Sequence, residues 1–98
     1  MKIIKEALAG TLESSDLMVK VAPSPGGGVE LVLNSEVIRQ FGAQIERVVR
    51  DTLAKLDLES GIVVIEDKGA LDCAIRARVQ AAVLRGAECD DLDWRALS

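Results

Sequence analysis

The chain has 98 residues and is 49% hydrophobic, which suits one domain with a substantial core. That core must be aliphatic, because the sequence holds one Phe, one Trp and no Tyr. A net charge of −4 argues against nucleic acid or anionic membrane as a partner, and the lack of histidine excludes Ser-His-Asp catalysis, Cys-His catalysis and a His-ligated zinc site.

The N-terminal segment predicts a short strand, placed either at Ile3 and Ile4 or over residues 8–12. Residues 1–6 are charged and lack the apolar core of a signal peptide. No apolar run in the sequence approaches the roughly 20 residues of a membrane span. We therefore expect a cytoplasmic protein without membrane association.

Residues 10–16 form a short polar segment that places two adjacent hydroxyls, Ser14 and Ser15, beside Asp16. Read from the residues alone, the segment has two interpretations. A serine here carries a reactive function, or both hydroxyls only satisfy a turn at the entrance to a strand. Because little else in the sequence could support chemistry, the two serines are the leading candidates for a site.

Two strand-like segments follow. Leu17, Val19 and Val21 alternate with more polar positions, and the same alternation returns over residues 29–34. Between them, residues 23–28 are rich in proline and glycine and break regular structure. Since no Gly-Lys-Ser/Thr follows these glycines, a phosphate-binding loop is disfavoured. The pattern instead predicts an antiparallel hairpin with a loose loop.

A long amphipathic helix of about 20 residues is predicted next, with Asn34 or Ser35 as its cap and Glu36 in its first turn. Its apolar face comprises Val37, Ile38, Phe41, Ile45, Val48, Val49, Leu53 and Leu56. The charged side chains of the opposite face, Arg39, Glu46, Arg47 and Arg50, are expected to be solvated.

Residues 62–65 are β-branched and apolar on both faces, which predicts a central strand covered on both sides. A second amphipathic helix then shows its apolar stripe at Leu71, Ile75, Val79, Ala82 and Val83, with Gly86 as a left-handed stop. Cys73 is expected in or beside the buried face of this helix. Two cysteines, Cys73 and Cys89, make neither a disulfide framework nor a metal site, and both are expected to be free thiols.

Together these elements predict an α+β fold, a small antiparallel or mixed sheet with two helices packed on one face. A single domain covers residues 1–98, and its acidic tail, residues 87–98, is expected to be flexible. Trp94 in that tail is either a packing anchor or a partner contact. The basic residues Lys68, Arg76, Arg78 and Arg85 are interpreted as a solvated helix face and not as a phosphate-binding surface.

Two separated motifs resemble the citrate lyase acyl carrier protein family, the gamma subunit of that enzyme. The first is Ala9-Gly10-Thr11-Leu12-Glu13-Ser14-Ser15-Asp16, which is similar to the family's attachment segment. The second is Asp67-Lys68-Gly69-Ala70-Leu71-Asp72-Cys73 followed by Arg76-Ala77-Arg78. The resemblance covers nearly the whole chain except the proline-glycine loop and the acidic tail.

The resemblance implies that Ser14 carries a covalently attached phosphoribosyl-dephospho-CoA group through a phosphodiester bond. The thiol of this group holds an acetyl thioester. An acyl transferase (alpha) subunit exchanges acetyl for citryl, and a lyase (beta) subunit cleaves the citryl thioester. A cofactor transferase attaches the group during maturation. The chain would be a non-catalytic carrier in citrate fermentation, with no catalytic or metal-binding residue of its own.

Family members often have glycine after the modified serine, where this chain has Ser15, so both hydroxyls stay open as the attachment point, with Ser14 favoured. A carrier of malonate decarboxylase, with the same kind of arm, is the alternative within this class. A non-enzymatic interaction module, with both serines structural, is the alternative outside it. A small enzyme using Asp67, Lys68 and Asp72 is disfavoured because carboxylates keep a lysine protonated. Partner docking is assigned either to the surroundings of Glu13 and Asp16 or to the helix bearing Arg76 and Arg78.

Overall fold

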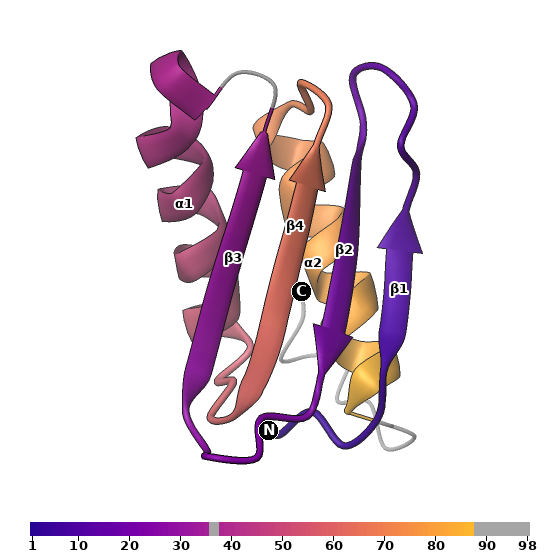
Figure 1. Ribbon diagram of the computed structural model, residues 1–98, viewed down its shortest axis with the longest axis vertical. Helices are drawn as coiled ribbons and strands as arrows, with labels where there is room; N and C mark the ends of the chain where they lie inside the picture. Colours follow the sequence, from indigo (N-terminus) through magenta and orange to yellow (C-terminus); the bar gives the residue numbers. More distant parts are fainter. Residues whose placement is uncertain (36–37, 88–98) are drawn as a thin grey trace.

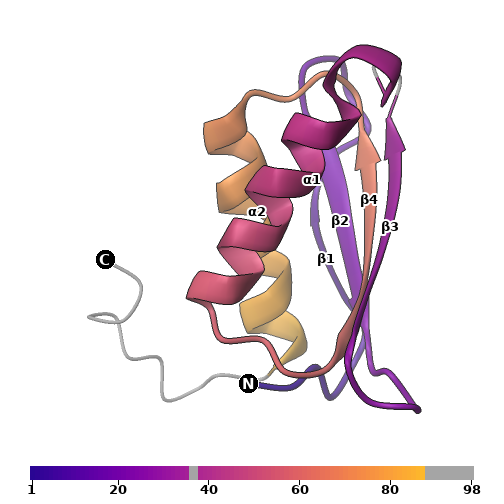
Figure 2. The same ribbon diagram turned by 90° about the vertical axis from the view of Figure 1, so that its left-hand side faces the viewer.

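The fold is a four-stranded sheet with two helices, seen in a computed structural model that describes residues 1–35 and 38–87. In chain order the elements are β1 (Ala7–Gly10), β2 (Leu17–Ala22), β3 (Val29–Ser35), α1 (Ile38–Lys55), β4 (Gly61–Asp67) and α2 (Asp72–Gly86). The strands lie side by side in the order β1-β2-β4-β3 (Figure 1). Both helices cover the same face of the sheet (Figure 2). The predicted α+β class, with a mixed sheet and helices on one face, is confirmed.

Strand β4 occupies the centre of the sheet. It pairs antiparallel with β2 and parallel with β3, and α1 provides the crossover connection that a parallel pair needs. Val63 and Ile65 are fully buried under the helices. On the other face Ile62 and Val64 are only partly buried, so β4 is central as predicted but is not covered on both sides.

The predicted hairpin between the second and third strands is wrong. The two strands exist and run in opposite directions, but β4 lies between them and pairs with each. A strand that is apolar on both faces gains most from a position with neighbours on both edges. Residues 23–28 therefore span the width of β4 instead of making a tight turn. The hairpin partner of β2 is β1, which fulfils the second of the two placements expected for an N-terminal strand.

The core between sheet and helices is aliphatic, as the composition predicted. Leu17, Val19 and Val21 of β2 are at most 2% exposed, which confirms the predicted inward face of that strand. The buried set further comprises Ile3, Ala9, Ile45, Val48, Val49, Leu53, Leu56, Val63, Ile65, Ile75, Val79, Ala82 and Val83. The protein thus builds its fold on β-branched and leucine side chains without an aromatic anchor among these residues.

Helix α1 begins later than predicted. Asn34 and Ser35 are the last residues of β3, and their side chains donate hydrogen bonds to Glu66 and Asp67 on β4. These two side chains hydrogen-bond across the strand pair. Their predicted role as helix caps stays a prediction, because residues 36–37 lie outside the described residues. The predicted first-turn residue Glu36 and the apolar Val37 lie outside the described residues.

The rest of α1 follows the predicted pattern closely. Ile45, Val48, Val49 and Leu53 are buried, and the charged face, where described, is exposed at Glu46, Arg47 and Arg50. Phe41 departs from the predicted apolar face because its side chain is 48% exposed.

Helix α2 corrects two predictions. Gly86 is the last residue of the helix, and the residue after it, Ala87, has φ −84°, so no left-handed stop occurs here. The glycine is needed for packing, because a Cβ at this position would come within 2.6 Å of Val21 Cγ2. Cys73 is exposed and not on the buried face. Cys89, Trp94 and all of the acidic tail after Ala87 lie outside the described residues.

Candidate functional site

The turn between β1 and β2, residues 11–16, holds both candidate serines. It lies at the same end of the molecule as the loop between β4 and α2, residues 68–71 (Figure 1). The pairing register explains this proximity, because Leu17 at the start of β2 is opposite Asp67 at the end of β4. The fold therefore brings the two sequence motifs, some 50 residues apart in the chain, to the same end of the sheet.

Ser14 is at the tip of this turn and is exposed. Within residues 1–35 and 38–87, no hydrogen bond to the Ser14 hydroxyl is found, and the same holds for the Ser15 hydroxyl. The structural alternative, in which the two hydroxyls only make hydrogen bonds within the turn, is therefore not supported by these contacts. Both side chains are available to a reaction partner.

The backbone distinguishes the two serines. Ser15 has φ +65°, a left-handed conformation that favours glycine, and its N–H donates to the carbonyl of Lys68 at 2.8 Å. A glycine would adopt this conformation at lower steric cost than serine. Ser14 is not among the residues with positive φ. Ser15 thus contributes a left-handed backbone conformation and a backbone hydrogen bond to the turn, and Ser14 has no positive φ.

Asp16 stabilises the turn by accepting hydrogen bonds at both of its carboxylate oxygens. Oδ1 accepts from the backbone N–H of Leu17 at 2.8 Å and from Arg78 Nε at 3.3 Å. Oδ2 accepts from the Thr11 hydroxyl at 3.0 Å and from Arg78 Nη2 at 2.9 Å. The hydrogen bonds from Arg78, foremost, and from Leu17 lower the pKa of Asp16 below its ordinary value of 3.8. Asp16 is consequently the ionised centre of the site.

Asp67 organises the facing loop. Its carboxylate, 2% exposed, accepts from the N–H groups of Gly69 and Ala70 and from the Ser35 hydroxyl, the last at 2.7 Å. The next residue, Lys68, then exchanges backbone hydrogen bonds with the serine turn: its N–H donates to Asp16 O at 2.9 Å. A buried carboxylate thus fixes the loop that in turn fixes the Ser14 turn.

These contacts bear on two earlier interpretations. The carboxylates of Asp67 and Asp72 are each engaged elsewhere, by the loop and by Gln44 Nε2, which argues against a small catalytic site built on them with Lys68. The interpretation of Arg78 as part of a solvated face is only partly right, because its side chain is 41% exposed but also forms the fork to Asp16. Arg78 stood in the second motif, but its long-range partner had no signal in the local sequence.

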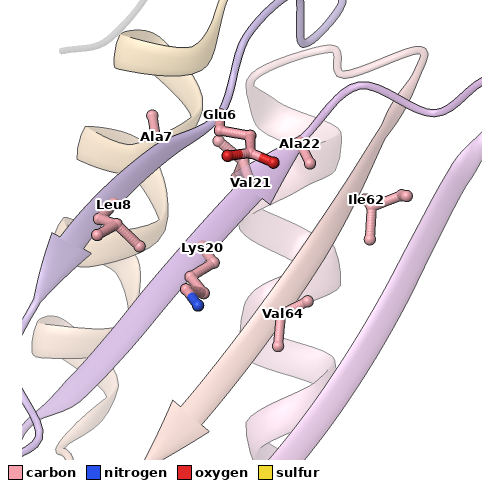
Figure 3. A pocket seen from close by; sticks show the side chains of 8 residues that line it. All are labelled: Glu6, Ala7, Leu8, Lys20, Val21, Ala22, Ile62 and Val64. Carbon is pink, nitrogen blue, oxygen red and sulfur yellow. The ribbon is translucent and has the colours of Figure 1, made fainter.

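Hollows on the surface of the described chain include one on the sheet and one beside α1. One, of about 550 Å³, lies on the open face of the sheet, where Leu8, Lys20 and Val64 point outward from three strands (Figure 3). The other, of about 640 Å³, lies between α1 and the β4–α2 loop and includes Phe41 and Leu71. Within the described residues there is no cluster of three metal-ligating side chains, and neither helix has the length and apolarity to cross a membrane.

This chain matches a family model and curated relatives that are acyl carrier proteins. Residues 4–86 match the family model described as "ACP: Malonate decarboxylase delta subunit (MdcD)". The chain is 63% identical to the citrate lyase acyl carrier protein of Cronobacter sakazakii, with 99% of each chain covered. It is 60% identical to those of Enterobacter sp. and Rhodopseudomonas palustris, with 100% of each chain covered.

A solved structure shares the fold at much lower sequence identity. It is the crystal structure of a Pseudomonas malonate decarboxylase hetero-tetramer in complex with malonate, one chain of which matches with a TM-score of 0.70. The match covers 87% of each chain at 18% identity. At that identity the likeness concerns the fold alone.

Proposed function

The chain belongs to the acyl carrier protein family that includes the citrate lyase acyl carrier proteins, and we propose that it is the carrier subunit of a citrate lyase with a phosphoribosyl-dephospho-CoA group attached to Ser14. Full-length identities of about 60% to citrate lyase carriers favour that enzyme over malonate decarboxylase. The family model is also named for a malonate decarboxylase subunit, but the solved malonate decarboxylase chain is only 18% identical. The protein itself has a carrier role and performs no catalysis.

The observation that carries this proposal is the contrast between the Ser14 side chain and its backbone. The hydroxyl is exposed and has no hydrogen bond within the described part of the chain. The backbone on either side is held, by Thr11 before the serine and by Asp16 after it. An attachment point needs both properties, because a modifying enzyme must reach the oxygen and must find it in one place.

The residues around Ser14 fit a phosphodiester link. Such a link adds one negative charge, and the carboxylate of Asp16, two residues along the turn, is already paired with the Arg78 guanidinium. Exposure of Ser14 leaves room for a long substituent on the solvent side. When attached, the group supplies a thiol that carries an acyl group as a thioester. The chain contributes the attachment oxygen, the held backbone around it and the surface that partner subunits contact.

The proposal also names partners. A cofactor transferase forms the bond to Ser14, and acyl transferase and lyase subunits use the attached thiol in turn. Tethering keeps the acyl group at a high local concentration near both subunits, in the millimolar range for short flexible linkers. Neither exposed cysteine chemistry nor a proton-transfer residue of this chain is required for that role, so Cys73 is dispensable.

The decisive experiment is intact mass after co-expression with the citrate lyase cofactor transferase. The wild-type chain and Ser15→Ala should both gain a large adduct, and Ser14→Ala should gain none. The two alanine variants are matched, because both hydroxyls are exposed and make no hydrogen bond in the described structure. An adduct that persists in Ser14→Ala and vanishes in Ser15→Ala would move the site to Ser15. A wild-type chain that is never modified would favour the non-covalent interaction module.

A further inference from the structure

The ion pair between Asp16 and Arg78 has two points of contact. Two nitrogens of the guanidinium face two oxygens of the carboxylate, a fork that fixes orientation as well as distance. The side chain of Asp16 is 19% exposed and that of Arg78 is 41% exposed. By contrast, the pair of Glu46 and Arg50 on α1 is about half exposed on both sides and has a single contact. Water screens the α1 pair more strongly.

The fork joins parts of the molecule that are distant in sequence. Asp16 also holds Thr11 and the Leu17 N–H, so one carboxylate connects the end of β1, the start of β2 and the middle of α2. Ser14 lies inside the short segment enclosed by Thr11 and Asp16. Removal of the guanidinium would take away the described hydrogen bonds between the turn and α2, and would leave those to the Lys68 backbone.

We propose that Arg78 is a positioning residue for Ser14, acting through Asp16 to hold the serine turn in the conformation that the cofactor transferase modifies. This inference rests on the proposed function and adds a residue from α2 to the attachment site. Arg78 does not touch the Ser14 hydroxyl in the structure, so its effect is exerted on the backbone of the turn.

Arg78 could either position Ser14 or contact the transferase, and variants of Arg78 and Asp16 have different effects in the two cases. If it positions Ser14 through Asp16, then removing either partner has the same effect, and removing both adds little. If it instead contacts the transferase directly as a surface cation, then Asp16→Asn leaves that contact in place. A positioning defect lowers the rate of the chemical step, whereas a lost docking contact weakens binding.

The test measures kcat and KM for modification of the purified apo chain by the cofactor transferase and its activated dephospho-CoA precursor, read by intact mass. Arg78→Gln and Asp16→Asn should each lower kcat by roughly 10- to 100-fold with little change in KM, and the double variant should match the single ones. Arg78→Lys, which keeps the charge without the fork, should be intermediate. Rates are compared at a temperature where circular dichroism shows every variant folded.

Arg85→Gln is the matched control. Arg85 lies two turns along the same helix and donates to the carbonyl of Leu8 at 2.7 Å, so it ties α2 to β1 without touching the turn. It should be modified at the wild-type rate. Wild-type kcat in folded Arg78→Gln and Arg78→Lys would overturn the inference, as would a rise in KM confined to the Arg78 variants. Failure to modify the wild-type chain would instead overturn the proposed function.

Discussion

The two loops at opposite ends of β2 differ in how many hydrogen bonds tie them to the rest of the protein. The turn of residues 11–16 is tied to the β4–α2 loop and to α2, through Ser15, Asp16 and Arg78. The loop of residues 23–28 makes mostly internal contacts, such as Gly27 N–H to Ser24 O, and joins the sheet through Gly28 O. Side chains added at its glycines would meet no atom within 4 Å.

This difference fits two different roles: residues 23–28 only connect two strands, whereas residues 11–16 hold the proposed attachment serine. The glycine-rich loop only has to span β4, so the fold leaves it open. The serine turn is held by hydrogen bonds to the β4–α2 loop and to α2, while the hydroxyls of Ser14 and Ser15 are left exposed. On the proposed function, movement belongs to the attached group, and the backbone keeps the attachment point in place.

The largest expected effect breaks the held loop at its base. Gly10 has φ +96°, and a Cβ there would lie 1.9 Å from the backbone oxygen of Leu17, which cannot move without opening the β1–β2 pair. Gly10→Ala should lower the free energy of unfolding by about 3 kcal/mol or more. Gly26→Ala, in the open loop without positive φ, should change it by less than about 1 kcal/mol. Chemical denaturation of both variants checks this, and equal effects would remove the contrast between the loops.

The second prediction removes the carboxylate that organises the β4–α2 loop. Asp67→Ala leaves the N–H groups of Gly69 and Ala70 and the Ser35 hydroxyl without their acceptor. The free energy of unfolding should fall by about 2 to 3 kcal/mol. Asp51→Ala, at an exposed position on α1, is the matched control and should change stability by less than about 0.5 kcal/mol. A loss in Asp67→Ala no larger than in the control would show that the loop is held by other contacts.

The third prediction concerns pH. The pKa of Asp16 is lowered in the folded protein, mainly by the hydrogen bond from Arg78, so its carboxylate adds stability above the ordinary pKa of 3.8. That contribution is lost as the pH falls below this value through the folded pKa. Wild type should therefore be more stable than Asp16→Asn near neutral pH, and the difference should shrink in acid. Urea denaturation over a pH series measures it, and a difference independent of pH would contradict the ion pair.

The smallest expected effect tests the shape of the serine turn. Ser15→Gly relieves the left-handed strain at φ +65° but gives the unfolded chain more freedom. The free energy of unfolding, measured by urea denaturation, should therefore change by less than about 0.5 kcal/mol. Ser15→Val should cost about 1 kcal/mol or more, because a β-branched side chain disfavours that conformation. If valine is tolerated as well as glycine, the turn does not depend on the left-handed residue.

Local pattern predicted the elements well because each depends on near neighbours in sequence. The alternation of Leu17, Val19 and Val21 identified a strand and its buried face, and the three- and four-residue spacing through Ile45 to Leu53 identified α1. Ser14 was singled out from its motif, and the structure supplies its exposure and held backbone. Its modification stays a prediction.

Pairing and packing were decided by contacts between distant segments. The sequence determined a small aliphatic α+β domain and a serine segment. Its composition set the kind of core, and hydrophobic periodicity and turn-forming residues set the local elements. Only the tertiary structure placed β4 between β2 and β3, which ruled out a hairpin that the loop composition favoured. Only the tertiary structure brought Arg78 across 62 positions to Asp16, since an ion pair depends on where two elements pack and leaves no periodic trace in either.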